Sequence, residues 1–312
     1  MDNRKEDEKY MRRCIQLARG GTGTTRPNPM VGAVIVHDGT IIGEGYHIRC
    51  GEGHAEVNAF ASVKPDDERL LPSSTLYVSL EPCAHYGKTP PCANLIISKG
   101  VKRVVVGCVD VFAKVHGRGI DMLRHAGITV DVGVLEDDCR NLNKRFFSFH
   151  SRHRPHVTLK WAQTANGFID DNFRPTALST PLTAMLCHKM RAESDAILVG
   201  RVTDERDKPR LDVRHWTGKN PRRIALGHHT DIAALLNGLY DDGVQSLLVE
   251  GGAKTHAAFF NCNLWDEARV ETAPMTVNGG TRAAALPGNV TLLSVRDYDG
   301  NRIETYANTS PA

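Results

Sequence analysis

Short, mostly apolar runs alternate with helical segments along most of this chain. The runs LYVSL at 76–80 and RVVVG at 103–107 have the length of strands, and their composition predicts strands buried in a sheet. The segments 54–63 and 92–100 are typical of helices, and a glycine ends the second. This alternation predicts an α/β layer with helices on both faces of a sheet.

The alternation is interrupted once, at the polar and basic segment FHSRHRPH (149–156), and then restarts. Because 312 residues exceed one average domain, we expect two domains, covering 1–150 and 151–312. The first is expected to hold helices at 4–19, 54–63, 92–100 and 117–126, a hairpin of strands at 31–36 and 41–47, and strands at 76–80, 103–107 and 128–135. The second is expected to hold strands at 156–163, 195–200, 222–226 and 245–249, and helices at 181–191, 231–242 and 253–260.

The composition restricts the classes of partner. The net charge is +3 and no run of Lys or Arg forms a basic stripe, so we expect no nucleic-acid partner. No apolar stretch approaches the length of a membrane span, and the N-terminal MDNRKEDEKY is too polar for a signal peptide. The eight cysteines are scattered without a framework of short spacings, which predicts reduced thiols in a cytoplasm, some of them metal ligands.

A group of His, Glu and Cys residues predicts a zinc site. His54 and Glu56 open a predicted helix, and Cys83 follows a proline at the end of a predicted strand. This order matches the H-x-E and P-C signature of zinc deaminases. His54, Cys83 and Cys92 would be the three ligands, which leaves the fourth position of zinc for a water molecule. Glu56 would carry the proton from that water to the departing amine.

The spacing of the two cysteines leaves an alternative open. Eight residues separate Cys83 from Cys92, whereas compact zinc sites use two to four. A structural zinc site would need a fourth protein ligand, from His85 or another cysteine. The presence of Glu56 favours a catalytic site, because a structural site does not need a carboxylate beside the metal.

The motifs TRPNPMVGAVIV, GEGYH, HAEVNAF, LEPCAHYGKTPPC and RVVVG, in this order, closely resemble the deaminase half of the bifunctional riboflavin-biosynthesis deaminase/reductase family. The resemblance covers nearly all of residues 8–150. It implies a cytidine-deaminase-like three-layer domain with one zinc ion per chain. It also implies that the domain hydrolyses the 2-amino group of 2,5-diamino-6-ribosylamino-4(3H)-pyrimidinone 5′-phosphate. The substrate-binding residues that it implies are Asn28, His47, His85, Lys88 and Asp110, with Lys88 at the phosphate.

The motifs LKWAQTANGFID, RAESDAILVG, LLVEGGA and LWDEARV resemble the reductase half of the same family. The resemblance implies a dihydrofolate-reductase-like α/β domain that uses NADPH to reduce the ribosyl group to ribityl. Gly251 and Gly252 lie between a predicted strand and a predicted helix, where glycines let backbone N–H groups approach a phosphate, although a tight turn is the alternative. The cofactor-binding residues that it implies are Ala162, Thr203, Asp207, Gly251 and Gly252. The implied substrate-binding residues are Lys160, Ser179, Arg191, Leu211, Arg214 and Glu250.

The chain departs from the family pattern at several places. Asp110 is followed by Val-Phe-Ala-Lys instead of the usual Pro-Asn-Pro, so a turn fixed by prolines is lost. In the second half, Asn166 replaces an acidic residue and Ala177 stands where Trp is expected. The segment RRIALG (222–227) passes almost directly to the predicted helix 231–242, which indicates a domain shortened around 227–230. A shortened sheet loses part of a dinucleotide site.

We therefore expect a zinc-dependent pyrimidine deaminase of riboflavin biosynthesis, followed by an NADPH-dependent reductase that yields 5-amino-6-ribitylaminouracil 5′-phosphate. The alternatives are a deaminase with a degenerate reductase domain, a deaminase of another nucleobase or nucleoside, and a non-catalytic zinc module. The expected partner is a small phosphorylated pyrimidine, with no nucleic acid and no membrane. The resemblance also implies a homo-oligomer.

Overall fold

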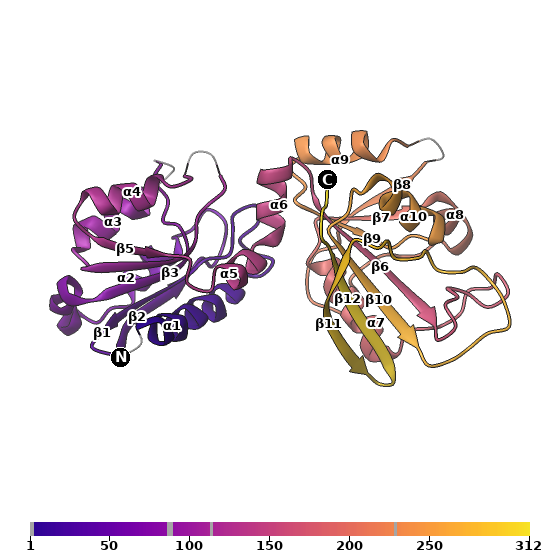
Figure 1. The fold of residues 1–312 in the computed structure, drawn as a ribbon, viewed down its shortest axis with the longest axis horizontal. Coiled ribbons are helices and arrows are strands. Elements are labelled where there is room, and N and C mark those ends of the chain that lie inside the picture. The colour runs from indigo at the N-terminus through magenta and orange to yellow at the C-terminus, as the bar shows by residue number, and fades with distance from the viewer. Residues whose placement is uncertain (1–2, 86–89, 113–114, 228–229) are drawn as a thin grey trace. The chain divides into compact units, whose positions relative to one another are not determined.

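The computed structural model of the chain describes residues 3–85, 90–112, 115–227 and 230–312 (Figure 1). The chain divides into two compact units, Met1–Ser151 and Arg152–Ala312. Each unit contains one sheet with helices on its faces, so the predicted α/β class is confirmed. No helix in the described ranges is both long and apolar enough to cross a membrane.

The described part of the first unit forms a five-stranded sheet in the order β2-β1-β3-β4-β5. The β1–β2 hairpin and the β1–β3 pair are antiparallel, and β3, β4 and β5 are parallel to one another. The strands are β1 (Gly32–His37), β2 (Thr40–Tyr46), β3 (Thr75–Leu80), β4 (Arg103–Cys108) and β5 (Thr129–Val132).

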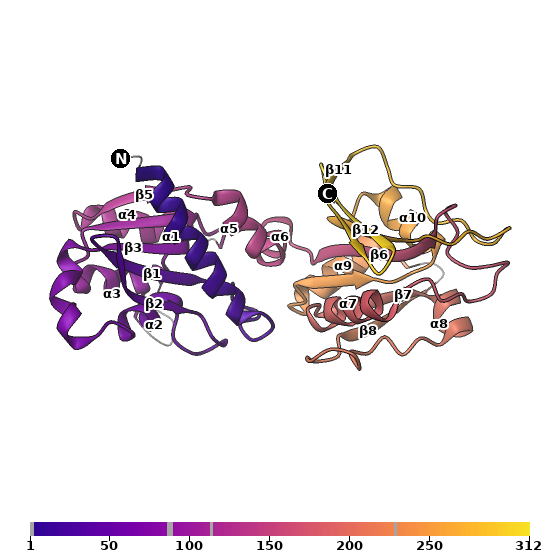
Figure 2. The ribbon, with the colours of Figure 1, turned by 90° about the horizontal axis from the view of Figure 1, so that it is seen from below.

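Helices cover both faces of this sheet, as Figures 1 and 2 show. Alternate side chains of one strand enter two different cores: Ala33 and Ile35 pack with α2, α3 and α4, whereas Val34 and Val36 pack with α1, α5 and α6. This two-residue period is the pattern of a strand buried on both faces. The helices are α1 (Asn3–Ala18), α2 (Ala55–Ala61), α3 (Cys92–Lys99), α4 (Arg118–His125), α5 (Glu136–Leu142) and α6 (Lys144–Arg152), with 3₁₀ segments η1 (Arg19–Gly21) and η2 (Pro65–Ser73).

Two helices of the first unit were not predicted. We expected a strand to extend over 128–135 and a polar seam at 149–156, but β5 ends at Val132 and α6 continues through Arg152. Helix α6 carries basic residues at both ends, so its sequence does not show an obvious apolar face. Phe146 and Phe147 are nevertheless buried in the core. Burial of two aromatic side chains explains why so polar a segment is helical.

The second unit has a seven-stranded sheet in the order β11-β12-β10-β6-β9-β7-β8. The strands from β10 to β8 are parallel to their neighbours, and the C-terminal β11–β12 hairpin extends the sheet antiparallel to β10. The strands are β6 (His156–Thr164), β7 (Ala196–Gly200), β8 (Arg222–Leu226), β9 (Ser246–Val249), β10 (Glu267–Ala273), β11 (Val290–Tyr298) and β12 (Asn301–Asn308). The helices are α7 (Pro181–Ala192), α8 (Arg201–Asp207), α9 (Ile232–Asp241) and α10 (Ala253–Cys262).

The core of this unit again has two sides. Ala196 and Leu198 of β7 pack with α9 and α10, whereas Ile197 and Val199 face the opposite side with Leu248. The connection between β8 and α9 is short, because β8 ends at Leu226 and α9 begins at Ile232. Residues 228 and 229, within the segment where the sequence indicates a shortened domain, lie outside the described residues.

Candidate active sites

The structure brings together the three predicted zinc ligands from three different elements. His54 is the residue immediately before α2, Cys83 follows β3, and Cys92 is the first residue of α3. The Nδ1 atom of His54 is 3.5 Å from Sγ of Cys83 and 3.3 Å from Sγ of Cys92. The three ligand atoms lie within 4.8 Å of one another. One imidazole nitrogen and two sulfurs converging on one point fit a zinc ion with an open fourth position.

The surroundings of Cys83 favour a thiolate, whereas the hydrogen bond with Cys83, together with burial, raises the pKa of Cys92. The backbone N–H of Cys92, at the start of α3, donates to Sγ of Cys83 at 3.2 Å. Hydrogen bonding from Cys92, together with that from His54, lowers the pKa of the Cys83 thiol despite its burial. A thiol with a lowered pKa binds a metal readily, because the thiolate is the form that coordinates.

Glu56 lies in the first turn of α2, two residues after His54, and its side chain is buried. Burial, with the charge of Cys83, raises the pKa of Glu56 to about 7. A carboxyl group with a pKa near neutrality both accepts and returns a proton at neutral pH. The arrangement therefore places a proton carrier beside the ligand set.

Asn28 and His47 lie next to this ligand set. The Nδ2 atom of Asn28 is 3.3 Å from Nε2 of His47, and Nδ1 of His47 is 3.1 Å from the carbonyl oxygen of Gly53. The rings of His47 and His54 are 5.4 Å apart in an edge-to-face arrangement. His85 is exposed and its ring lies 6.2 Å from that of Phe112. Lys88, the expected phosphate ligand, lies outside the described residues.

Asp110 is buried and shapes the turn that follows β4. Its Oδ1 accepts a hydrogen bond of 2.8 Å from the N–H of Phe112, and its carbonyl oxygen lies 2.8 Å from Nδ1 of His116. Burial raises the pKa of Asp110 to about 6. Asp110 therefore holds Phe112 and His116 through hydrogen bonds, next to positions where the family pattern has prolines.

Sequence reasoning missed Glu81, which also holds this loop. Its carboxylate accepts N–H groups from Asp110 (3.2 Å), Gly117 (2.9 Å), Gly119 (3.0 Å) and Ile120 (3.4 Å). Glu81 thereby fixes the start of α4 against the end of β3, two residues before Cys83. The only sequence signal is its place in the motif LEPC, because its partners lie 29 to 39 residues away.

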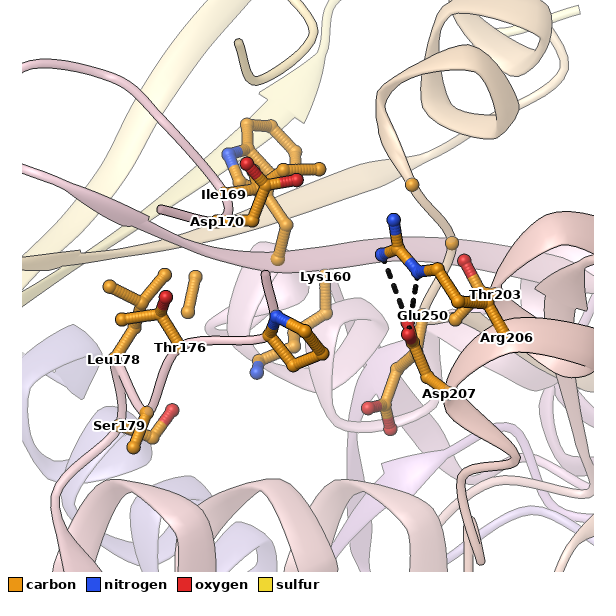
Figure 3. Close-up of a pocket in the computed structure, with 16 residues that line it drawn as sticks. Lys160, Ile169, Asp170, Thr176, Leu178, Ser179, Thr203, Arg206, Asp207 and Glu250 are labelled. Atoms are coloured by element: carbon orange, nitrogen blue, oxygen red, sulfur yellow. Dashed lines mark hydrogen bonds and ion pairs between the residues drawn. The ribbon is translucent and has the colours of Figure 1, made fainter. Parts of the chain in front are cut away.

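The second unit contains a pocket of about 510 Å³. It is lined by β6, by the segment 169–179, by α8 and by the loop between β9 and α10 (Figure 3). Eight of the residues implied by the sequence line it: Lys160, Ala162, Ser179, Thr203, Asp207, Glu250, Gly251 and Gly252. Arg191, Leu211 and Arg214 are not among the lining residues.

The loop between β9 and α10 fits the phosphates of a dinucleotide. A Cβ atom at Gly251 would come within 2.5 Å of the Thr255 side chain, so the close packing there excludes a side chain. A Cβ atom at Gly252 would have Thr203 Oγ1 as its nearest neighbour, at 3.7 Å. Open backbone at the start of the ten-residue helix α10 is the arrangement that binds phosphate groups. The residues present therefore fit NADPH.

Lys160 lies on the floor of the pocket near a buried carboxylate that sequence reasoning missed. Its Nζ is 3.9 Å from Oε2 of Glu271, which also accepts a hydrogen bond of 2.9 Å from Oγ of Ser179. Asn301 donates to the other oxygen of Glu271 at 2.6 Å. Burial lowers the pKa of Lys160, but its electrostatic interactions with Cys187, Glu250 and Glu271 outweigh this effect, and the net shift is upward. Lys160 is therefore protonated at neutral pH and can donate a proton within the pocket.

The three residues outside the pocket lining have other contacts. Arg191 makes an ion pair with Glu250 at 2.7 Å, and Arg214 makes one with Asp212 at 2.6 Å. Leu211 is buried in the small core on one face of β7. Arg191 thus reaches the pocket only through Glu250.

Comparisons with known proteins identify the family. Residues 4–108 match the cytidine and deoxycytidylate deaminase zinc-binding region, and residues 155–307 match the RibD C-terminal domain. The chain is 36% identical over 322 residues to riboflavin biosynthesis protein RibD of Aquifex aeolicus, covering 89% of each protein. The chain belongs to the RibD family of riboflavin biosynthesis proteins.

Solved structures of RibD proteins resemble this chain over 98% of its length. The Thermotoga maritima structure, of a diaminohydroxyphosphoribosylaminopyrimidine deaminase/5-amino-6-(5-phosphoribosylamino)uracil reductase, has a TM-score of 0.90 and 32% identity. The structural match covers 98% of this chain and 99% of the Thermotoga chain. Acinetobacter baumannii RibD, in its form 1, has a TM-score of 0.86 and 29% identity, covering 98% and 100%. The predicted cytidine-deaminase-like domain followed by a reductase domain is confirmed.

Membership of the RibD family confirms the predicted activity and cofactors. The chain is a zinc-dependent deaminase and an NADPH-dependent reductase of riboflavin biosynthesis. The alternatives of a degenerate reductase, another nucleobase or a non-catalytic zinc module are not favoured. The departure at Asn166 is accommodated within the RibD fold, because its Nδ2 donates to the carbonyl oxygen of Val277 at 2.7 Å.

Proposed function

We propose that this chain catalyses two successive steps of riboflavin biosynthesis. The first is hydrolytic deamination of 2,5-diamino-6-ribosylamino-4(3H)-pyrimidinone 5′-phosphate, and the second is reduction of the ribosyl group to ribityl. The substrates named for the Thermotoga relative support this proposal. The observation that carries it is the convergence of His54, Cys83 and Cys92 beside the buried carboxyl group of Glu56.

In the deamination, His54, Cys83 and Cys92 would hold the zinc ion. When bound, the ion activates a water molecule for attack on the ring carbon that carries the amino group. Glu56 carries one proton from this water to the adjacent ring nitrogen and the second proton to the amino group, so that the C–N bond breaks, ammonia leaves and the water oxygen becomes a carbonyl oxygen. Asn28, held by His47, contributes an amide at the edge of the site.

In the reduction, the loop Glu250–Gly252 and the residues of α8 would hold NADPH. When bound, NADPH supplies a hydride to the ribosyl carbon that is attached to the ring amine. Lys160 donates the proton that the sugar-ring oxygen needs when its bond to that carbon breaks. Glu250 and Glu271 keep Lys160 charged before each turnover, and Ser179, which donates to Glu271, lines the same side of the pocket as Leu178 (Figure 3).

The deaminase proposal is tested with Glu56→Gln in the full-length chain. Because the variant lacks only a proton carrier, we expect about one zinc ion per chain and a fall in deamination of about 100-fold or more. Full deamination by this variant would contradict the mechanism. NADPH oxidation with the deaminated product tests the second half, and we expect it to be unchanged in Glu56→Gln. A chain that neither binds NADPH nor oxidises it would contradict the reductase proposal.

We further propose that the chain assembles as a homodimer and acts in the cytoplasm. Strand β11 is the edge of its sheet, and Leu292, Leu293 and Val295 on it are 40 to 54% exposed. An apolar edge strand pairs readily with a second copy across a two-fold axis. We expect Leu293→Lys to convert a dimer into a monomer in light scattering.

Cysteine zinc ligands suit a reducing compartment, and cell fractionation should recover the chain in the cytoplasm.

A further inference from the structure

The reductase pocket carries more negative than positive side chains. Among the described residues that line it, the carboxylates are Asp170, Asp207 and Glu250, and the cations are Lys160 and Arg206. Under the proposed function, both the pyrimidine and NADPH bring a phosphomonoester into the second unit. A dianion enters such a pocket only if a cation is available to meet it, because like charges repel strongly where water is excluded.

Most of these charges already have partners. Arg191 makes two hydrogen bonds to Glu250, at 2.7 and 2.8 Å. Asp170 accepts the N–H groups of Thr281 at 2.8 Å and Phe173 at 3.2 Å. Lys160 is only 9% exposed and lies beside Glu271. Glu250, Asp170 and Lys160 therefore each have a partner of their own among the described residues.

Arg206 is placed differently. Thr203 and Arg206 are three residues apart on α8, and residues at this spacing lie on one face of a helix. Both line the pocket, and Figure 3 shows them on the same side as Asp207. A Cβ atom built on Gly252 would have Thr203 Oγ1 as its nearest neighbour, at 3.7 Å, so this face of α8 adjoins the open backbone before α10. The side chain of Arg206 is 47% exposed, so a ligand can reach it.

The present partner of Arg206 is one that a phosphate can replace. Its Nε and Nη2 atoms lie 2.7 and 3.3 Å from the two carboxylate oxygens of Asp207. An exposed ion pair of this kind contributes about 1 kcal/mol or less. A phosphomonoester carries more charge and offers a guanidinium two parallel acceptors, which makes a stronger contact. The contact with Asp207 holds the guanidinium in place until the ligand arrives.

We propose that Arg206 is the phosphomonoester-binding residue of the reductase pocket. Its ligand is either the 2′-phosphate of NADPH or the 5′-phosphate of the pyrimidine. The inference rests on the proposed function, since both phosphates belong to the proposed ligands. It also differs from what the sequence implies, because Arg191 and Arg214, the arginines expected at the substrate, do not line the pocket.

The test compares Arg206→Ala and Arg206→Lys with the wild-type chain by calorimetric binding. The probes form two pairs: NADPH with NADH, and the deaminated pyrimidine phosphate with its dephosphorylated nucleoside. Loss of a bidentate phosphate contact should weaken one phosphate-bearing ligand about tenfold or more in Arg206→Ala and leave its phosphate-free counterpart unchanged. Arg206→Lys keeps the positive charge but cannot form two parallel hydrogen bonds. Its affinity for the phosphate-bearing ligand should therefore lie between those of the wild type and Arg206→Ala. The affected pair identifies the source of the phosphate.

Arg222→Ala is the matched control. Arg222 is exposed, pairs with Asp242 at 2.6 Å, lies in the same unit and does not line the pocket. The Arg222→Ala variant removes one positive charge, as Arg206→Ala does, but away from the pocket. We therefore expect it to bind all four probes as the wild type does. Equal losses for both members of a pair, or wild-type binding of all four probes by Arg206→Ala, would overturn the inference. A wild-type chain that binds none of the probes would instead overturn the reductase proposal and this inference with it.

Discussion

The guanidinium of Arg191 and the carboxylate of Glu250 form two parallel hydrogen bonds, Nε to Oε1 at 2.7 Å and Nη2 to Oε2 at 2.8 Å. Glu250 lines the reductase pocket, whereas Arg191, on α7, does not. Burial raises the pKa of Glu250, but the hydrogen bonds and the charge of Arg191 outweigh it, and the net pKa lies below its usual value. Arg191 therefore keeps Glu250 ionised and oriented toward the pocket.

Replacing Arg191 by Met should weaken the reductase through Glu250. Without its cation, Glu250 stays buried, so its pKa rises and the carboxylate is protonated at a higher pH. We expect the acid limb of the kcat/KM profile for reduction to move to higher pH. The loss at neutral pH should be about tenfold or more, as for a broken hydrogen bond to a charged group.

Arg191→Lys provides the matched variant. Lysine keeps the positive charge but cannot form two parallel hydrogen bonds, so its pH profile should lie between those of the wild type and Arg191→Met. A uniform loss of activity with no movement of the acid limb would indicate a purely structural role. Deamination by the same samples verifies that the first unit is folded, and a cooperative urea-unfolding transition of the second unit verifies that this unit is folded too.

The zinc ligands could be predicted because short local patterns specify them. His54 and Glu56 are two residues apart at the start of one helix, and Cys83 and Cys92 each follow a proline next to a strand or a helix. A strand and a helix of recognisable pattern then bring these positions to one end of the sheet. Because imidazole and thiolate bind zinc and a carboxylate carries protons, the residue types then predicted the role of each position.

Residues that act through distant contacts could not be predicted in this way. Glu81 and Glu271 each accept hydrogen bonds from groups that are tens of residues away, and no local pattern marks those partners. Strand β11 was missed because it is an edge strand with little burial, so its side chains show no alternation of apolar and polar residues. Arg206 belongs to no motif, and its position at the pocket depends on how α8 packs.

Glu81→Gln should destabilise the first unit. The carboxylate accepts four backbone N–H groups from the loop after β4 and the start of α4, and glutamine replaces one of its oxygens with an NH₂ group that cannot accept. Buried N–H groups without acceptors cost roughly 1–3 kcal/mol. We expect a fall of that size in the unfolding free energy of this unit, measured with urea. Glu136→Gln, at an exposed ion pair with Arg140, is the control, and equal stability of the two variants would contradict the assignment.

Removal of zinc should separate the two activities. His54, Cys83 and Cys92 all belong to the first unit, and none of them lines the described pocket of the second. A chelator should therefore reduce deamination to the background rate while reduction of the deaminated product with NADPH continues at the wild-type rate. Added zinc should restore deamination, because the ligand set remains in place. Loss of both activities on chelation would contradict the separation.

Asp266 anchors the start of the second unit, and its loss should destabilise that unit. The Asp266 carboxylate accepts hydrogen bonds from Arg154 at 2.7 and 3.1 Å and from the N–H of Val157 at 2.7 Å. Arg154 is itself only 4% exposed. Asp266→Asn leaves this arginine buried without a counter-charge, and breaking a buried pair in this way costs about 3–5 kcal/mol. Urea unfolding at neutral pH should show a loss of that size, whereas Asp242→Asn, at an exposed pair with Arg222, should cost under about 1 kcal/mol.

The pH dependence of this loss follows from the pKa of Asp266. Burial raises that pKa, but His156 and Arg154 outweigh the effect, so the folded-state pKa lies below the usual 3.8. The unfolded chain therefore binds more protons than the folded chain in this range, and the stabilisation is present above pH 3.8 and lost as the pH falls through the folded-state pKa. The difference in unfolding free energy between the wild type and Asp266→Asn should be constant near neutrality and should shrink in acid below pH 3.8. A difference that stays the same throughout the acid range would show that Asp266 does not contribute as an ionised group.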